Sequence, residues 1–170
     1  MLYREFMHII IAYFSSTKRN EFIFDILIPA FIVIGGRFCI EDIDKKVELL
    51  NSILTIASII MGFTIASITV ILTTNSQNMK DAKTIDGGKR ALNIQLTMFQ
   101  CLLIPFFYVA VFCLISIMFI IFVLSFGLYE DHRTLVDIAI FSVLHIVTVE
   151  IRSITNLFFL VLPHRENSNT

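Results

Sequence analysis

Two long stretches without a charged side chain limit what this chain can fold into. They run from Leu49 to Met79 and from Ala91 to Tyr129 in a chain of 170 residues. A helix that crosses a hydrocarbon core about 30 Å thick needs about 20 residues. Each stretch is therefore long enough to span a membrane, and the sequence predicts a bilayer as the solvent of both.

The composition agrees with a membrane protein. Hydrophobic side chains make up 56% of the chain and charged ones 16%, and the mean hydropathy is +0.83. Soluble domains carry about 25% charged residues, and a chain this short has too little interior to bury such an excess of apolar side chains. The net charge of -1 gives no bulk attraction to nucleic acid, so direct nucleic-acid binding is not expected.

Two weaker apolar segments, residues 22–40 and 134–162, flank the uncharged stretches and also read as spans. We therefore predict an all-α integral membrane protein with four transmembrane helices that forms a homo-oligomer. The predicted layout is an interfacial helix over 1–20, spans over 22–40, 49–73, 95–128 and 134–162, a basic loop over 74–94, and a tail over 163–170.

The distribution of Lys and Arg predicts the orientation, because these residues favour the cytoplasmic side. With the N-terminus inside, the inner segments hold eight such residues and the outer segments hold four. Both termini and the 74–94 loop are thus expected in the cytoplasm. The last two spans exceed one crossing, so Gln95–Phe107 and Thr155–Leu162 are expected to extend into the cytoplasm as paired helices, packed against another copy or another protein.

Charged residues within the weaker spans are costly, at about 2.5–3.5 kcal/mol each at mid-membrane, so they should lie near the interfaces or find partners. In the predicted topology Asp25 and Arg152 share the inner level, and Arg37 and Asp137 share the outer level. We hypothesise that each of these two pairs joins the outer spans. The alternative is that each charge reaches its own membrane surface independently. Glu150 gains no partner in this scheme. Glu150 and His145 could form a proton relay. The simpler alternative is that Glu150 is an interfacial carboxylate and His145 a hydrogen-bonded helix histidine.

The second span carries small and hydroxyl side chains spaced three or four residues apart, and hence on one helix face. They are Thr55, Ser58, Gly62, Ala66, Thr69 and Thr73. Small residues let helices approach closely, which predicts a packing seam between helices. The alternative is a stripe that lines the central axis of an oligomer as a pore.

The predicted cytoplasmic loop is polar and basic, with Lys80, Lys83, Lys89 and Arg90. Such a segment attracts anionic lipid headgroups, at about 1 kcal/mol per basic residue near the surface. It could equally bind an acidic cytosolic partner, or only set the topology.

Motifs of catalysis are missing from the sequence. It contains no HExxH, GxSxG or CxxC, and Gly87-Gly88-Lys89-Arg90 lacks the spacing of a phosphate-binding loop. Cys39, Cys101 and Cys113 lack the spacing of a zinc or redox pair and read as small packing residues. The sequence predicts neither an enzyme nor a metal or cofactor site.

The layout of the whole chain, together with Met61-Gly62-Phe63-Thr64-Ile65-Ala66-Ser67 in the second span, resembles the KwaA family, the membrane subunits of the Kiwa anti-phage defence system. The resemblance implies a homo-oligomer, a tetramer in this family, in the bacterial inner membrane. It also implies a sensor of phage-induced membrane disturbance that holds a cytosolic DNA-binding effector, KwaB. The alternative function is a homo-oligomeric channel or membrane-depolarising pore.

Overall fold

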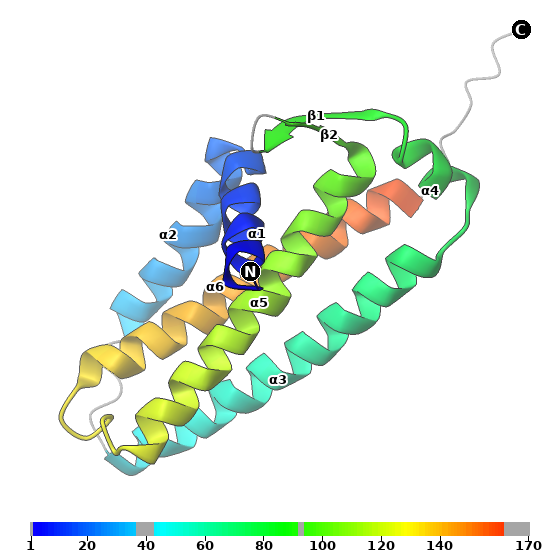
Figure 1. The fold of residues 1–170 in the computed structure, drawn as a ribbon. Helices are drawn as coiled ribbons and strands as arrows, with labels where there is room; N and C mark the ends of the chain where they lie inside the picture. The colour runs from blue at the N-terminus through cyan, green and yellow to red at the C-terminus, as the bar shows by residue number, and fades with distance from the viewer. Residues whose placement is uncertain (1, 37–42, 92–93, 162–170) are drawn as a thin grey trace, which may run out of the picture.

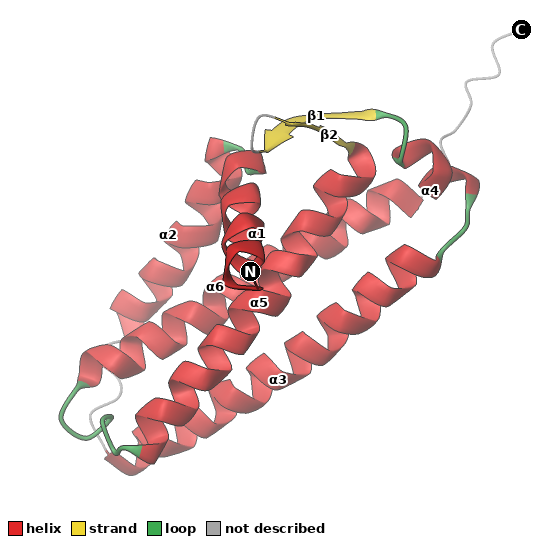
Figure 2. Cartoon of the chain, in the orientation of Figure 1, coloured by secondary structure: helices red, strands yellow, loops and turns green. Residues whose placement is uncertain are grey.

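Long helices dominate the architecture, seen here in a computed structural model that describes residues 2–36, 43–91 and 94–161. In chain order the elements are α1 (Leu2–Ser16), α2 (Arg19–Gly36), α3 (Ile43–Thr73), α4 (Gln77–Ala82), β1 (Asp86–Ala91), β2 (Ile94–Thr97), α5 (Met98–Ser125) and α6 (Arg133–Val161). The long helices run beside one another along a common direction, and the two strands cover one end of the bundle (Figure 1, Figure 2).

Helices α3, α5 and α6 form the centre of the bundle. They contain 31, 28 and 29 residues, which corresponds to lengths of about 46, 42 and 43 Å. The segments Lys45–Thr73, Met98–Ser125 and Arg133–Phe158 are each long and apolar enough to cross a membrane. These three helices mark the chain as a membrane protein.

The core consists of three apolar clusters placed along the bundle. One joins α3, α5 and α6 near the end that carries the turn between α5 and α6, and includes Leu50, Ile120 and Val136. A middle cluster joins α1, α5 and α6 around Tyr13 and Tyr108. The third lies near the strands and packs α5 against the end of α3 and against α4.

The third cluster bears on the predicted cytoplasmic extension of α5. Leu102, Leu103 and Phe106 are buried against Ile68 and Ile71 of α3, among others. This part of α5 therefore finds an apolar partner within its own chain, where the sequence suggested another copy or another protein.

The segment 74–94, predicted as a loop between two spans, contains regular structure. Ser76 caps α4 by accepting a hydrogen bond from the backbone N–H of Met79. Strand β1 then pairs antiparallel with β2, in the register Arg90 opposite Gln95. This small sheet is a departure from the all-α class, since backbone pairing between two short polar segments replaces the expected loop.

Glycines make the hairpin possible. Gly88 has a φ of +65° at the irregularity in the pairing, a conformation that side chains with a Cβ rarely adopt. At Gly87 a Cβ would lie 2.5 Å from the Sγ of Cys101 and 3.0 Å from the carbonyl oxygens of Leu96 and Thr97. Strand β1 can therefore lie against α5 only because this position lacks a side chain.

Helix boundaries differ from the predicted spans by a few residues. α3 begins at Ile43 instead of residue 49, and α5 begins at Met98 instead of 95, where Thr97 and Gln100 form a reciprocal capping box. α6 and the predicted fourth span differ by one residue at each end. The end of the predicted first span, the turn of the hairpin and the predicted tail lie outside the described residues.

Candidate functional site: a buried polar network below the hairpin

A buried ion pair joins α2 to α6, as the charge pattern predicts. The Nη2 atom of Arg152 lies 2.7 Å from Oδ2 of Asp25, whose side chain has no exposed surface. The hydroxyl of Tyr13 donates to the same oxygen at 2.7 Å, and Arg152 in turn donates to the Tyr13 oxygen at 2.8 Å. Three helices, α1, α2 and α6, therefore meet at one carboxylate.

A second carboxylate extends the network to the hairpin. Oε2 of Glu21 accepts from Arg152 Nη1 at 2.9 Å and from Lys89 Nζ at 3.2 Å. Lys89 is in β1, whereas Glu21 is in the first turn of α2. A continuous run of charged contacts thus links the hairpin through α2 to α6.

An aromatic pair carries the network across to α5. The rings of Tyr13 and Tyr108 are stacked, with centroids 3.8 Å apart and planes 7° from parallel. The Tyr108 hydroxyl lies 2.8 Å from Nε2 of His145, and Nδ1 of His145 lies 2.9 Å from the backbone carbonyl of Asp25.

These contacts assign the histidine proton. A carbonyl oxygen only accepts hydrogen bonds, so Nδ1 of His145 must carry the hydrogen. In the neutral ring Nε2 is then the acceptor, and the Tyr108 hydroxyl donates to it. His145 of α6 thus links α2 to α5 through hydrogen bonds of both ring nitrogens.

Burial and neighbouring charges set the ionisation of Tyr13 and Glu21. Burial raises the pKa of the Tyr13 hydroxyl above its ordinary value. The positive charge of Arg152 lowers this pKa and the Asp25 carboxylate raises it, and the net effect is a raised pKa. The Tyr13 hydroxyl therefore keeps its proton and remains a hydrogen-bond donor. Burial also acts to raise the pKa of Glu21. The Lys18 backbone N–H, Lys89 and Arg152 outweigh it, and the pKa of Glu21 lies below 4.5, so that side chain is an anion.

The network is not fully satisfied. Oδ1 of Asp25 and Nε of Arg152 are buried without a hydrogen-bond partner among the described residues. A buried polar atom left in this state costs about 1–3 kcal/mol. The arrangement is therefore held by strong contacts but also carries an energetic penalty.

Glu150 lies elsewhere in the bundle, between α6 and α3. Its side chain is 5% exposed, and Oε1 lies 3.1 Å from the hydroxyl oxygen of Thr64. The structure thus gives Glu150 a contact where charge pairing predicted none, and buries it where an interfacial position was expected. Hydrogen bonds of His145 lead to Tyr108 and Asp25, away from Glu150.

The predicted stripe on α3 faces away from the bundle. Every member is exposed, whereas the core residues of α3 lie on the opposite side of the helix. The four hydroxyls of Thr55, Ser58, Thr69 and Thr73 each donate to the carbonyl one turn earlier in the same helix.

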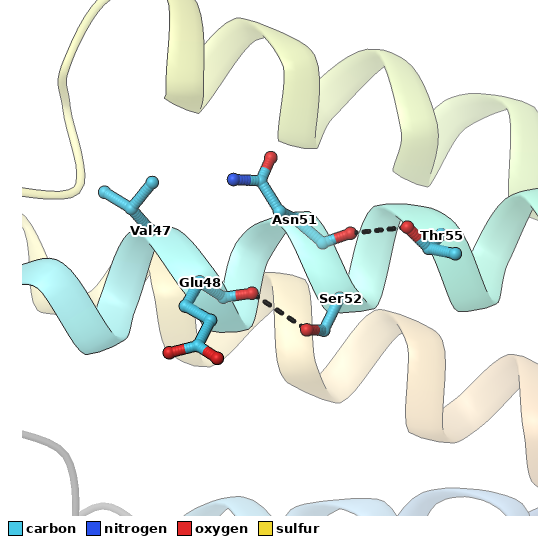
Figure 3. Close-up of a pocket in the computed structure, with 5 residues that line it drawn as sticks. All are labelled: Val47, Glu48, Asn51, Ser52 and Thr55. Carbon is cyan, nitrogen blue, oxygen red and sulfur yellow. Dashed lines mark hydrogen bonds between the residues drawn. The ribbon is translucent and has the colours of Figure 1, made fainter.

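The same face continues toward the start of α3 as a polar surface. Val47, Glu48, Asn51, Ser52 and Thr55 line a shallow pocket there (Figure 3). The hydroxyls of Ser52 and Thr55 donate to the carbonyls of Glu48 and Asn51 (Figure 3). Glu48 and Asn51 are exposed on a helix that is long and apolar enough to span a membrane.

The four basic residues of the predicted loop have different surroundings. Lys80 and Arg90 are exposed, and Nζ of Lys83 lies 5.0 Å from the centre of the Phe99 ring. Lys89 is held by Glu21 and is thus part of the buried network, which charge counting alone did not show.

The second predicted pair, Arg37 with Asp137, involves a residue outside the described part of the chain. Asp137 itself lies with Lys46 and Arg133 around a cavity between α2, α3 and α6. Among the residues that the structure describes, no group of three His, Cys, Asp or Glu side chains could hold a metal ion.

Sequence reasoning paired Asp25 with Arg152 but missed Tyr13, Glu21 and Tyr108 as members of the network. It named Lys89 only as part of a basic loop. The two tyrosines occur in apolar helical patterns, where they read as packing residues. Glu21 is one turn before Asp25 and would lie on the same helix face, so its proximity to Arg152 could have been inferred.

The fold and this network together define a helical membrane protein in which the hairpin at one end is joined to charged residues of the bundle by the Lys89–Glu21 ion pair. Comparison with known protein families, with curated proteins and with solved structures finds no match for the chain.

Proposed function

We propose that this protein is a self-associating scaffold in the bacterial inner membrane that senses membrane disturbance and presents its hairpin face to a cytosolic effector, as the Kiwa membrane subunits do. The observation that carries the proposal is the run of contacts from Lys89 through Glu21 and Arg152 to Asp25. Any movement of α2 relative to α6 must change the pairing that holds β1. A change within the membrane would thereby alter the surface on the cytoplasmic side.

The proposal includes α2 as a fourth span. With 18 residues α2 is about 27 Å long, close to the thickness of a hydrocarbon core, and it packs along α6. Its charges are confined to the first two turns, where Glu21 and Asp25 are paired with Arg152. Its outer face is apolar, and the Phe31 side chain is 80% exposed.

The position of the N-terminus tests the four-span arrangement. Four spans put an N-terminal tag on the same side of the membrane as a reporter inserted after Lys83, whereas three spans put them on opposite sides. A protease-accessibility assay on sealed inner-membrane vesicles distinguishes the two. A reporter in the turn after His132 is the control for the opposite side.

Self-association is proposed through the outward stripe of α3. In its most apolar window α3 has 17% of its residues buried, whereas α5 and α6 each have 39%, so α3 has the largest uncovered face of the three. Glu48 and Asn51 on that face would meet lipid in a monomer. Small side chains and an amide that both donates and accepts favour contact with a second copy.

Enlarging Gly62 tests this interface, because nothing lies within 4 Å of a Cβ at that position and the chain itself tolerates the change. Gly62→Leu should convert the oligomer to smaller species in native mass spectrometry. Val70→Leu is the control, since Val70 is exposed on the same helix but about 80° away from Gly62. A wild-type protein that is monomeric in mild detergent would refute self-association.

Effector recruitment is proposed for the exposed basic residues of the hairpin face. Changing Lys80, Lys83 and Arg90 together to Gln should abolish co-purification with a soluble DNA-binding protein encoded beside this one. Lys89 is left unchanged so that the buried network is intact. The matched control neutralises Lys18 and Arg19, which are also exposed. Equal loss in both variants would show general charge attraction.

A pore is the second candidate, favoured by the polar residues along the exposed face of α3. The α3 hydroxyls already donate within their own helix, so toward a central axis they would offer only acceptor oxygens, which suit cations. A pore predicts ion flux through liposomes by the protein alone, reduced by Gly62→Leu. The scaffold predicts no flux.

A further inference from the structure

A cavity lies at the end of the bundle opposite the hairpin, between α2, α3 and α6. It has a volume of about 190 Å³. Most of its wall is apolar, from Ile32, Val33, Leu49, Val136 and Ile140, and its charged lining residues are Lys46, Arg133 and Asp137.

Lys46 is the unusual member of this lining. Its side chain is 7% exposed, although lysine is rarely buried without a partner. The one acceptor that the described part of the chain offers its ammonium group is the backbone carbonyl of Tyr129, at 3.4 Å. An ammonium group has three hydrogens to donate, and within the described residues this single long contact uses one of them.

The charge around the cavity favours an anion. Among the described lining residues, Lys46 and Arg133 contribute two cations and Asp137 contributes one carboxylate, which is engaged in an interaction of its own. One negative charge between Lys46 and Arg133 would balance the site. A phosphodiester carries that charge and offers several acceptor oxygens to the two donors.

The apolar surroundings favour a lipid over a free anion. Ile32 lines the cavity and also belongs to an exposed apolar surface of α2 that includes Leu27, Phe31 and Ile34. This surface continues from the cavity along the side of the bundle. This placement of a lipid rests on the four-span arrangement proposed above, in which α2 crosses the membrane: a molecule with its phosphate in the cavity could then place an acyl chain along α2 within the hydrocarbon region.

We propose that this cavity binds the headgroup of an anionic phospholipid, with its phosphate between Lys46 and Arg133 and an acyl chain along α2. The site is independent of effector recruitment and of self-association. It would fix the end of α2 that lies away from the charged network, so that both ends of this helix are held.

Native mass spectrometry of the detergent-purified protein, titrated with phosphatidylglycerol or phosphatidylethanolamine, tests the proposal. The wild type should bind one phosphatidylglycerol per chain in preference to phosphatidylethanolamine. Lys46→Gln should weaken that binding at least about tenfold, because it removes a charged hydrogen bond to the bound phosphate. Lys45→Gln is the matched control, because Lys45 is the exposed neighbour of Lys46 and should change binding less than twofold.

A second variant protects the test against simple misfolding. Ile140→Phe fills the cavity without removing a charge and should also block the bound lipid. An excess of inorganic phosphate should not displace the lipid. Equal weakening by both lysine variants, retention of the lipid in Lys46→Gln or Ile140→Phe, or displacement by phosphate would each overturn the proposal.

Discussion

The Asp25–Arg152 pair gives a prediction in which the two partners are unequal. Asp25 is fully buried, and Arg152 is the one cation that contacts it among the described residues. Arg152→Leu would leave a buried carboxylate with the Tyr13 hydroxyl as its remaining partner. Removing one member of a buried ion pair typically costs about 3–5 kcal/mol.

Asp25→Leu should be milder, because Arg152 retains Glu21 at 2.9 Å. We expect a cost of about 1–3 kcal/mol, similar to the loss of charged hydrogen bonds. The double variant Asp25→Leu with Arg152→Leu should recover most of the stability lost in Arg152→Leu, since no uncompensated charge remains at the pair.

Thermal unfolding in a mild detergent measures the relative stability losses of these three variants. For a soluble chain of this size 1 kcal/mol corresponds to roughly 2–4 °C in Tm. Arg152→Leu should therefore lower Tm by about 6–20 °C, and the double variant by clearly less. If Asp25→Leu is as damaging as Arg152→Leu, or if the two single effects add in the double variant, the coupling inferred from the geometry is wrong.

Three further predictions concern the network and the hairpin. Tyr13→Phe keeps the stacked ring but removes the hydroxyl shared by Asp25 and Arg152, and should lower the free energy of unfolding by about 1.5–3 kcal/mol in a detergent unfolding titration. The pKa of Glu21 lies below 4.5 in the folded protein, so the stability that this side chain contributes is complete above pH 4.5 and is lost as the pH falls through the lowered pKa. The Tm of the wild type should therefore exceed the Tm of Glu21→Gln by a constant amount from pH 6 to 8. The two Tm values should converge in acid. Gly87→Ala should disrupt the hairpin more than Gly88→Ala does, because the new Cβ would meet Cys101 and two backbone carbonyls, and hydrogen exchange of the β1 amides reports the difference.

Three of the four predicted spans correspond to helices long and apolar enough to cross a membrane, and they could be predicted because the required apolar length follows from membrane thickness. The pairing of Asp25 with Arg152 could also be predicted, since depth in the membrane follows from position along two antiparallel helices. Exchanging the two charges, with arginine at position 25 and aspartate at position 152, would not test this pair alone. An aspartate at position 152 would face Glu21, a neighbour that the pairing scheme did not include.

The hairpin could not be predicted in the same way. Residues 86–91 are Asp-Gly-Gly-Lys-Arg-Ala, which have low strand propensity and no alternation of apolar and polar residues. Their conformation depends on tertiary contacts, namely the approach of Gly87 to α5 and the pairing of Lys89 with Glu21. Such contacts join distant parts of the chain and leave no local signal.

The separation of Asp25 and Arg152 along the chain has a consequence for biogenesis. During synthesis α2 leaves the ribosome long before α6, so the Asp25 carboxylate is present for some time without the cation that compensates it in the folded chain. The contacts of α1 and α2 around Asp25 are therefore complete only after α6 has packed against them. A chain truncated before residue 133 would lack Arg152 and leave the buried Asp25 carboxylate uncompensated, so that the seating of α2 depends on completion of translation.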